Sequence, residues 1–597
     1  MISIKEIRPP RKCSGLSSIL VYFPRNEELT KIIKSMETFY YHKKDDSYEL
    51  PIVSLAKILD LMTFYDDIQL NLLDTNKNAN LASLNAHNKD LTDDEINSFK
   101  VKPFEHQIAG INYGLNSESG KWLLLDEMGA GKTNEIIWYA ETLKRRGLIE
   151  HCLIICGVNA LKQNWKKEIQ KFSTESAVIL GEKITKFGTS MYMSVADRAK
   201  QLLNPIEEFF VITNIETFRN DKVVEAFAKS KNNFGLIAVD EIHRIANKTS
   251  TQGGNLLKLK APYKVAATGT LLVNSPMSCY VPLFWTENDH STLTMYKSQY
   301  CVMGGFNNQQ FVDYKNLEVL QEEIKSCSIR RTKEEIAPFL PPKTVTTEVI
   351  ELTEEHRKFY KLLVDSIKQD MQAPDFDREL KQAQAFHEAS KIADKVVLHD
   401  TLLGIITRLR QATVLPSILS SKTEMQSSSK IDRCVELVED LVSQNEKVVV
   451  LSTFKEPVYV LEKLLLKYKP LVCTGDVSDY EVSNNVTEFQ TNPDCKIFLG
   501  TFGKCSTGIT LNAASYLIAL DETWTASQNN QAWDRIHRIN NTKPAFIKVL
   551  MCKDTIDEKV HSIANYKEDL SDYIVDGEEN HIATDPAKEL LSYLYGL

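Results

Sequence analysis

The residues of this chain that are best placed to do chemistry are Asp126-Glu-Met-Gly-Ala-Gly-Lys-Thr133. They lie between an apolar run at 122–125, which predicts a buried strand, and residues 134–143, which have a helical pattern. Glycines between a strand and a helix let backbone N–H groups surround a phosphate, and the helix N-terminus adds a partial positive charge. Lys132 is then predicted to reach the terminal phosphates and Thr133 to supply a hydroxyl for Mg²⁺.

One position departs from the generic phosphate-loop pattern, which has glycine five residues before Gly131, where this chain has Asp126. Taken alone, the stretch is therefore also compatible with a turn that binds no ligand. A second motif favours the ligand: the apolar run 234–239 predicts a buried strand and ends in Asp240-Glu241. Ligands of open α/β sheets bind at the carboxyl ends of strands. Asp240 is predicted to hold the metal through water, and Glu241 to orient or deprotonate the attacking water. The alternative is an acidic pair that only caps a helix. Together the two motifs predict hydrolysis of a nucleoside triphosphate.

A second α/β unit is predicted after a polar break at 420–429. Its expected strands, separated by helical patterns, are 447–452, 496–500 and 516–521. This alternation predicts a parallel sheet. The unit has no phosphate loop, but Arg535 and Arg538 are spaced to share one face of a helix. They are either a solvated surface pair or two guanidinium groups that reach the γ-phosphate of a nucleotide held by the first unit.

Length and composition place these motifs in an ordinary globular protein of several domains. The 597 residues are too many for one core, and 43% are hydrophobic and 25% charged. No apolar run approaches the roughly 20 residues that span a bilayer, and the N-terminus does not have the form of a signal peptide. The eleven cysteines are scattered, which favours core thiols over zinc ligands. A monomer in a reduced intracellular compartment is expected, in the cytoplasm of a bacterium or the nucleus or cytoplasm of a host cell.

The acidic charge is concentrated at the C-terminus. Of the net charge of −9, residues 566–597 carry −6 and the rest of the chain −3. A nearly neutral body can still hold a basic groove for nucleic acid, because binding depends on the local field. The tail ends in a short amphipathic helix pattern at 587–594. This helix is expected either to pack back on the body or to dock a protein partner.

Eight motifs in chain order resemble those of Swi/Snf-type ATPases of helicase superfamily two, across roughly residues 100–565. They are Pro103-Phe-Glu-His-Gln107, Asp126–Thr133, 153–157 with 164–168, 211–218, Asp240-Glu-Ile-His-Arg-Ile-Ala-Asn247, Thr268-Gly-Thr270, 329–333 with 340–343, and 407–411 with 531–538. The resemblance implies two RecA-like parallel-sheet lobes with helical protrusions and a bound ATP with Mg²⁺. It implies that Gln107 reads adenine and that Gly129, Ala130, Gly131, Lys132 and Thr133 hold the phosphates. It also implies that Thr268-Gly-Thr270 couples hydrolysis to nucleic acid.

Three positions differ from the family pattern. Leu271 follows Thr270 where proline is usual, Cys505-Ser506 replaces glycines, and Asn540-Asn541 replaces Gly-Gln. None of these removes a charge that hydrolysis needs. The change at Cys505-Ser506 is expected to alter the loop that links lobe two to DNA, and therefore to affect coupling to DNA more than ATP turnover.

The first 75 residues are predicted to form a small α+β module. A strand from Ile19 that ends at Pro24 precedes a helix at 27–36 capped by Asn26, a hairpin through 43–46 and a second helix from Ser54 to Met62. This order resembles the module ahead of the motor in HepA-related annealing helicases. The resemblance implies that Lys43, Lys44 and nearby tyrosines meet branched DNA. A plain structural cap on lobe one is the alternative.

The expected organisation is therefore α/β, with two RecA-like lobes behind a small module. The predicted parts are the module at 1–75, a linker at 76–98, lobe one at 99–338, a strand and helical protrusion at 339–425, lobe two at 426–565, and the acidic tail at 566–597. The resemblance suggests DNA contacts through Lys166, Thr213, Asn214, Thr501 and Lys504.

The function predicted from these features is a DNA-dependent ATPase that moves along duplex DNA and remodels or reanneals branched DNA, or displaces bound proteins. Two alternatives stay open. One is a strand-separating helicase of the same superfamily, and the other is a catalytically idle DNA-binding scaffold. The catalytic residues in this reading are Lys132, Asp240, Glu241, Arg535 and Arg538, with Thr133 and Asp240 as metal ligands.

Overall fold

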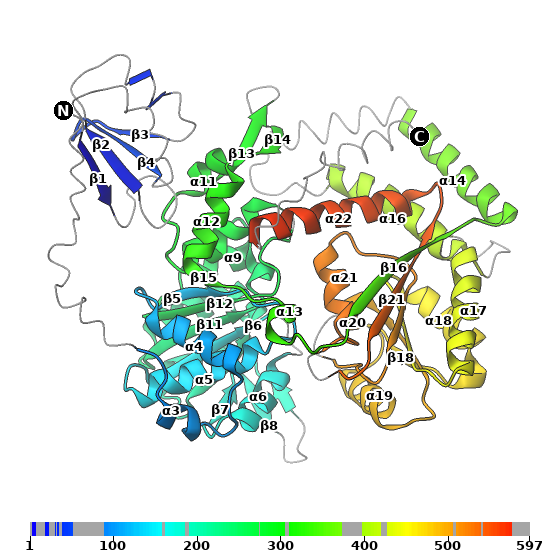
Figure 1. Cartoon of the computed structure of the whole chain (residues 1–597), viewed down its shortest axis with the longest axis horizontal. Helices are drawn as coiled ribbons and strands as arrows, with labels where there is room; N and C mark the ends of the chain where they lie inside the picture. The colour runs from blue at the N-terminus through cyan, green and yellow to red at the C-terminus, as the bar shows by residue number, and fades with distance from the viewer. Residues whose placement is uncertain are drawn as a thin grey trace. The chain divides into compact units, whose positions relative to one another are not determined.

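The computed structural model describes residues 3–7, 18–22, 30–31, 33–34, 39–51, 89–157, 161–184, 190–273, 275–304, 310–372, 397–419, 427–505, 509–538 and 541–575. The chain divides into two compact units (Figure 1). One comprises Met1–Ile336 with Leu570–Glu579, and the other Ala337–Asp569 with Asn580–Leu597. The division after Ile336 lies close to the predicted boundary after residue 338.

Lobe one, the larger part of the first unit, is built on a seven-stranded sheet in the order β15-β5-β12-β11-β6-β10-β7. Every pair of neighbouring strands is parallel. The strands are β5 (Lys121–Leu124), β6 (His151–Cys156), β7 (Ala177–Ile179), β10 (Phe210–Asn214), β11 (Phe234–Asp240), β12 (Tyr263–Ala267) and β15 (Ser328–Ile329). Parallel strands are covered on both faces, which is why they read as unbroken apolar runs. The predicted parallel sheet is confirmed.

Helices cover this sheet, and α4, α5 and α6 pack side by side (Figure 1). The α-helices are α3 (Asp93–Ser98), α4 (Glu105–Asn116), α5 (Lys132–Arg145), α6 (Leu161–Phe172), α7 (Val195–Leu203), α8 (Asp221–Lys229), α9 (Thr251–Leu256), α10 (Tyr280–Trp285), α11 (Leu293–Tyr300), α12 (Leu317–Cys327) and α13 (Lys333–Ile336). Short 3-10 turns lie at Ile215–Arg219, Ile242–Ile245 and Pro276–Cys279. Two hairpins, β8 (Glu182–Ile184) with β9 (Ser190–Tyr192) and β13 (Cys301–Gly304) with β14 (Gln310–Tyr314), complete lobe one.

The end of the predicted linker is part of lobe one. Residues 93–98, assigned to a linker from their polar composition, form helix α3. Thr92 and Glu95 make a capping box, with each side chain accepting from the other's backbone N–H at 3.2 and 2.9 Å. Leu91 and Phe99 join the lobe-one core. The part of the linker before residue 89 lies outside the described residues.

Lobe two is built on a six-stranded parallel sheet in the order β16-β21-β20-β17-β19-β18. The strands are β16 (Lys343–Ile350), β17 (Val448–Ser452), β18 (Leu471–Cys473), β19 (Ile497–Thr501), β20 (Tyr516–Ala519) and β21 (Ala545–Cys552). Successive side chains of β17 enter opposite faces: Val449 and Leu451 lie in one core cluster, and Val448 and Val450 in the other. Period-two burial on both faces is the signature of a central parallel strand.

The helices of the second unit lie around this sheet. They are α14 (Glu354–Gln372), α16 (Val397–Val414), α17 (Ser429–Ser443), α18 (Lys455–Leu464), α19 (Asp479–Thr491), α20 (Phe502–Cys505), α21 (Ala526–Trp533) and α22 (Ile556–Val575), with 3-10 turns at Pro416–Ile418 and Leu466–Tyr468. Helices α14 and α16 form the protrusion predicted before lobe two and share a core cluster with the start of α22. The three strands expected at 447–452, 496–500 and 516–521 correspond to β17, β19 and β20.

The N-terminal module contains a four-stranded antiparallel sheet in the order β1-β2-β4-β3. Its strands are β1 (Ser3–Ile7), β2 (Ser18–Tyr22), β3 (Tyr40–His42) and β4 (Ser47–Pro51). The predicted hairpin through 43–46 is present. The helix expected at 27–36 is described only at 30–31 and 33–34, where the backbone is helical. The second expected helix, from Ser54 to Met62, and the tail after residue 575 lie outside the described residues.

Two sequence-level expectations about the core can be checked against the described residues. Ten cysteines among them are free thiols, and all ten are buried, as predicted for core residues. None of the described helices combines the length and the apolar character that crossing a bilayer requires.

Candidate nucleotide site

The phosphate loop connects β5 to α5 at the carboxyl end of the lobe-one sheet. Gly129 and Gly131 have φ values of +87° and +93°, which side chains other than glycine rarely adopt. A Cβ at Gly131 would lie 2.5 Å from Gln107 Nε2. The loop therefore needs glycine for its backbone and for close approach of Gln107. The structure thus brings together two segments that the sequence analysis assigned to one nucleotide.

Helix α4 positions Gln107 against this loop. Gln107 Oε1 accepts from the backbone N–H of Phe104 at 2.9 Å, and its side chain is buried. His106, its neighbour, bonds the carbonyl oxygen of Ala130 through Nε2 at 3.0 Å. Burial lowers the pKa of His106, so the neutral ring is favoured. The first turn of α4 is thereby fixed to the loop.

Lys132 begins α5 and lies between the loop and two acidic residues. Its ammonium donates to the carbonyl oxygens of Asp126 at 2.7 Å and Glu127 at 3.2 Å. Burial lowers the pKa of Lys132, and the charges of Glu241, Asp126 and Asp240 oppose that shift. A cation held among carboxylates at a helix N-terminus suits a group that exchanges its partners for phosphate oxygens.

The acidic pair ends β11 next to this lysine. Trp165 Nε1 donates to Asp240 Oδ2 at 3.0 Å. Glu241 has φ +56°, a left-handed conformation, and its Oε2 lies 3.2 Å from His243 Nδ1. Burial and the Glu241 charge raise the pKa of Asp240. Burial acts on Glu241 in the same direction, but the bond and charge of His243 outweigh it and lower the pKa of Glu241. Of the two carboxyl groups, Glu241 therefore loses its proton at the lower pH.

A path of close polar contacts leads from this pair through His243 to Thr268-Gly-Thr270. His243 Nδ1 lies 2.9 Å from Thr268 Oγ1, which accepts from the Thr270 N–H at 3.1 Å. Gly269 also touches the phosphate loop, because a Cβ there would lie 2.5 Å from Met128 Cγ and 3.4 Å from Lys132 Nζ. Since β5, β12 and β11 are neighbours, three predicted motifs meet at one edge of the sheet.

Of the three residues of lobe one that were predicted to contact DNA, two are buried. Lys166 on α6 pairs with Glu182 at 2.9 Å. Thr213 and Asn214 end β10, where Thr213 is fully buried and Asn214 accepts from Thr217 Oγ1 at 2.6 Å. Among the described residues, Thr213 Oγ1 is a buried hydroxyl with no hydrogen-bond partner. Their role in DNA contact stays a prediction.

In lobe two, Arg535 and Arg538 do not share a helical face, which corrects the sequence reading. Helix α21 ends at Trp533, and Asp534–Ile536 continue as a tight turn. Ile536 is fully buried in the core, and its insertion ends the regular helix. Arg535 Nη1 and Arg538 Nη2 nevertheless converge, since both donate to the carbonyl oxygen of Ile509, at 3.4 and 3.1 Å. Thr501 ends β19 and Lys504 lies on α20, both half-buried.

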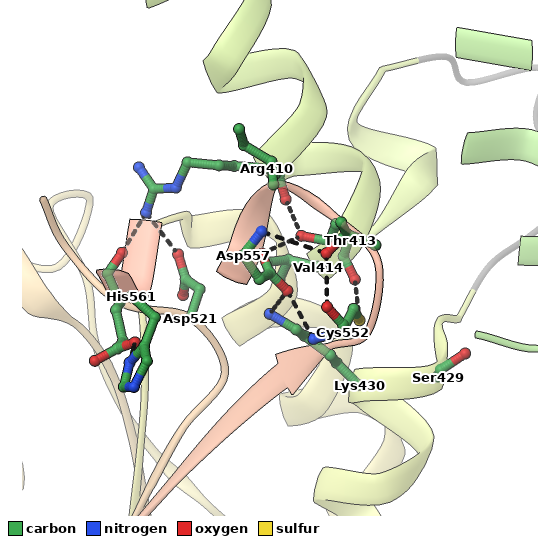
Figure 2. A network of polar contacts seen from close by, with 12 residues as sticks. Arg410, Thr413, Val414, Ser429, Lys430, Asp521, Cys552, Asp557 and His561 are labelled. Carbon is green, nitrogen blue, oxygen red and sulfur yellow. Dashed lines mark hydrogen bonds and ion pairs between the residues drawn. The ribbon is translucent and has the colours of Figure 1, made fainter. Parts of the chain in front are cut away.

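A buried polar network in lobe two was not predicted (Figure 2). Lys430 Nζ pairs with Asp557 Oδ2 at 2.7 Å, and Asp557 also accepts from Thr413 Oγ1 at 2.9 Å and from the Cys552 N–H at 3.0 Å. It joins α16, α17, the end of β21 and the start of α22. No sequence pattern could reveal it, since Asp557 is 144 residues from Thr413.

Arg410 extends this polar region to the strand ends of lobe two. Figure 2 shows its guanidinium turned toward Asp521, to which Nη2 donates at 3.3 Å. It also bonds Thr453 Oγ1 at 3.2 Å and the carbonyl oxygen of Glu522 at 2.5 Å. Thr453 follows β17 and Asp521 follows β20, so one side chain of α16 fixes two loops at the carboxyl edge of the sheet. Arg410 belongs to the 407–411 motif, which was recognised without a role.

Comparison with known proteins places this chain in a family. The SNF2-related domain matches residues 106–418, more than half of the chain, and the helicase conserved C-terminal domain matches residues 429–540. The uncharacterized ATP-dependent helicase MG018 of Mycoplasma genitalium is 25% identical over 536 residues, covering 86% of this chain and 46% of that protein. The ATP-dependent helicase FUN30 of Saccharomyces cerevisiae is 24% identical over 543 residues, covering 80% of this chain and 47% of that protein. This chain therefore spans about half the length of these curated relatives.

Among solved structures, the Sulfolobus solfataricus SWI2/SNF2 ATPase core in complex with dsDNA matches with a TM-score of 0.35 and 21% identity, covering 80% of this chain and 94% of that chain.

Proposed function

Because this chain belongs to the SNF2-related family, a class of ATP hydrolases of the helicase and translocase type, we propose that it uses ATP hydrolysis to move along duplex DNA. The observation that carries this proposal is a set of close contacts at one edge of the lobe-one sheet. There the phosphate loop, the acidic pair and Thr268-Gly-Thr270 are in mutual contact. A set of this kind binds a triphosphate and transmits the result of hydrolysis to neighbouring elements.

The side chains of lobe one fit ATP with Mg²⁺. Gly129 and Gly131, on either side of Ala130, both have positive φ and leave the loop amides free to turn inward, and the first amides of α5 have no intrahelical acceptor. The Thr133 hydroxyl and the Asp240 carboxylate are the hard oxygen ligands that Mg²⁺ prefers. When bound, the metal neutralises developing phosphate charge. Glu241, ionised and oriented by His243, accepts the proton of the attacking water.

The first test is ATP turnover with and without DNA. We expect Lys132→Ala to abolish hydrolysis while leaving DNA binding largely intact, because Lys132 contacts the phosphate loop and is not one of the residues proposed to contact DNA. Lys231→Ala, which removes an exposed lysine of the same lobe, is the matched control and should behave as wild type. DNA-stimulated hydrolysis that survives in Lys132→Ala would refute the assigned site. Absence of turnover in the wild type would favour the idle scaffold.

The proposal extends to lobe two. Arg535 and Arg538 converge on one carbonyl oxygen, so their guanidinium groups lie close together and are suited to act as a pair on one anion. The family resemblance suggests that this anion is the γ-phosphate of the nucleotide bound by lobe one. DNA contacts by Lys166, Thr213, Asn214, Thr501 and Lys504 rest on the same resemblance.

A finer proposal concerns branched DNA, as in HepA-related annealing helicases. It is supported by Phe39, which precedes the edge strand β3, and by Tyr40 and Tyr41 of that strand, which are 36%, 39% and 42% exposed. Exposed aromatic rings stack on unpaired bases, and Lys43 and Lys44, both exposed in the adjoining turn, suit backbone phosphates. The Tyr41 and Tyr48 rings, 4.9 Å apart, brace one another. The curated relatives include proteins named as helicases or translocases, which does not select among these activities.

Two DNA assays separate translocation and reannealing from strand separation. Triplex displacement without unwinding of a forked duplex supports the translocase, whereas unwinding of the fork supports the helicase alternative. We expect Tyr40→Ala to weaken reannealing and to leave duplex-stimulated ATP turnover unchanged, because the module is separate from the nucleotide site. Lys31→Ala, at another exposed position of the module, is the control. Equal reannealing by both variants would leave the module with a structural role.

A further inference from the structure

Asp126, the residue that departs from the generic phosphate loop, is bound by Arg331. Arg331 Nε donates to Asp126 Oδ1 at 2.9 Å and Nη2 bonds Oδ2, so guanidinium and carboxylate form a two-pronged pair. The Asp126 side chain is completely buried and that of Arg331 is 13% exposed. The carboxylate that opens the loop therefore meets the protein itself.

The same guanidinium reaches two other elements of the nucleotide site. Nη2 also contacts Glu135, in the first turn of α5, at 2.9 Å to Oε2 and 3.1 Å to Oε1. Nη1 bonds the carbonyl oxygen of His106, the residue before Gln107. Gly110 leaves room for this cluster, because a Cβ there would lie 1.9 Å from Glu135 Oε2 and 2.8 Å from Arg331 Nη2. One cation thus contacts the starts of α4, the phosphate loop and α5.

Charge balance makes this cation hard to replace. Burial and the neighbouring Asp126 raise the pKa of Glu135 well above its ordinary value. Burial opposes the charge on Arg331, but its bonds to Asp126 and Glu135 prevail and raise its pKa. Two carboxyl groups away from water require a cation between them, and removing it leaves Asp126 as an uncompensated buried charge.

The backbone that carries Arg331 lies along the loop as well. Leu125 N–H donates to the Ile329 carbonyl at 2.9 Å and Glu127 N–H to the Arg331 carbonyl at 3.0 Å. The Lys333 N–H donates to Glu127 Oε2 at 2.7 Å. This segment ends the first unit, whose division from the second falls after Ile336. The last segment of lobe one is therefore hydrogen-bonded along the start of the phosphate loop.

We propose that Arg331 is a positioning residue that holds α4, the phosphate loop and α5 in the arrangement that binds ATP, with Asp126 as its anchor. This inference rests on the proposed ATP site. Arg331 donates to carboxylates and a carbonyl of the protein, so it acts on the nucleotide indirectly. It acts through Gln107, which follows His106, and through Lys132, which donates to the Asp126 carbonyl oxygen. Its loss loosens a preorganised site, which weakens nucleotide binding more than it slows the chemical step.

The test is a double-mutant cycle of Arg331→Gln and Asp126→Asn in the full chain. It is read as the Kd for ADP and as kcat and KM for ATP without DNA. We expect Arg331→Gln to raise KM and Kd by roughly tenfold or more, with a smaller change in kcat. Arg331→Lys keeps the charge but loses the fork, so it should recover binding only in part. The double variant should bind no more weakly than Arg331→Gln, because the Asp126 carboxylate that loses its partner has been replaced by a neutral amide.

Lys264→Gln is the matched control for loss of a buried cation. Lys264 donates to the Trp285 carbonyl at 2.8 Å and to Glu287 at 3.0 Å, at the start of β12 and away from the loop. It should lower the melting temperature without changing KM. A KM shift in Arg331→Gln no larger than in Lys264→Gln, or fully additive effects in the cycle, would overturn the proposal. Wild type that binds no ADP or ATP would overturn the proposed function together with it.

Discussion

At the scale of single residues, an indole holds the carboxylate proposed to bind the metal. Trp165 Nε1 donates to Asp240 Oδ2, and the indole itself is buried. We expect Trp165→Phe to lower ATP turnover roughly tenfold, the effect of losing one hydrogen bond to a charged group. The test compares ATP turnover of Trp165→Phe and wild type over a range of Mg²⁺ concentrations. The same exchange at Trp138, whose Nε1 is buried without a partner among the described residues, is the control and should leave turnover near wild type.

The residues of the site that could be predicted are those whose role follows from local spacing. Lys132, Thr133 and the Asp240-Glu241 pair are marked by their place after an apolar run. Partners far apart in the chain carry no such mark: Trp165 is 75 residues from Asp240, and Arg331 is 205 residues from Asp126. The sequence showed that Asp126 was unusual, but only the fold shows what it contacts.

At the scale of elements, strands were predicted well and one helix end was not. Apolar runs identify parallel strands, since burial on both faces leaves no polar positions. The helix expected to carry Arg535 and Arg538 ends at Trp533, because the chain turns to bury Ile536. Helix α3 had a readable signal in its capping box, Thr92 to Glu95, which the polar composition of its surroundings concealed.

A second prediction concerns the buried ion pair of Lys430 and Asp557, which joins helices α17 and α22. Lys430→Met leaves a buried carboxylate without its cation, so we expect the unfolding free energy of lobe two to fall by about 3–5 kcal/mol. Adding Asp557→Asn should restore part of that loss, because the amide removes the charge and keeps an acceptor for Thr413. Urea denaturation followed by more than one probe measures both. Equal stability of the single and double variants would mean that the buried charge is not the cause.

A third prediction concerns the pH dependence of lobe two. Glu522 accepts from His561 on α22 at 2.6 Å, and this bond raises the pKa of the imidazole. A raised pKa in the folded state stabilises the protein below the ordinary value of 6.5 and loses that contribution as pH rises through the raised value. Wild type should therefore lose more stability than His561→Gln between mildly acidic and mildly alkaline pH. Parallel unfolding midpoints for both proteins would contradict it.

At the scale of the whole molecule, the part of the chain that the structure describes changes unit after Ile336 and again within α22 after Asp569. The first division lies near 329–333 and 340–343, the segments that the family resemblance marks as a junction between lobes. The second falls inside one continuous helix, where neither composition nor periodicity changes, so sequence could not reveal it.

The proposed action of lobe two on the nucleotide gives the fourth prediction. Arg538→Ala should lower kcat for DNA-stimulated hydrolysis while the Kd for ATP stays unchanged, because the guanidinium would act on charge that develops in the transition state. Turnover and nucleotide titration on the same preparation test it. Wild-type kcat in this variant would remove Arg538 from the mechanism.

The fifth prediction follows from DNA contact through phosphates. The affinity for duplex DNA should fall at least about tenfold between about 50 and 200 mM salt and depend little on base sequence. Binding isotherms on AT-rich and GC-rich duplexes, each at several salt concentrations, provide the measurement. A strong preference for one sequence would instead require base contacts.

The buried thiols can serve as probes of local opening throughout the molecule. Five of the described cysteines lie in each unit, and all are shielded from water. An alkylating reagent can reach each sulfur only when its surroundings breathe, so the order of labelling along the chain ranks local fluctuations. Peptide mass spectrometry after brief exposure to the reagent, with and without nucleotide, would show in which unit the cysteines become less accessible when nucleotide binds.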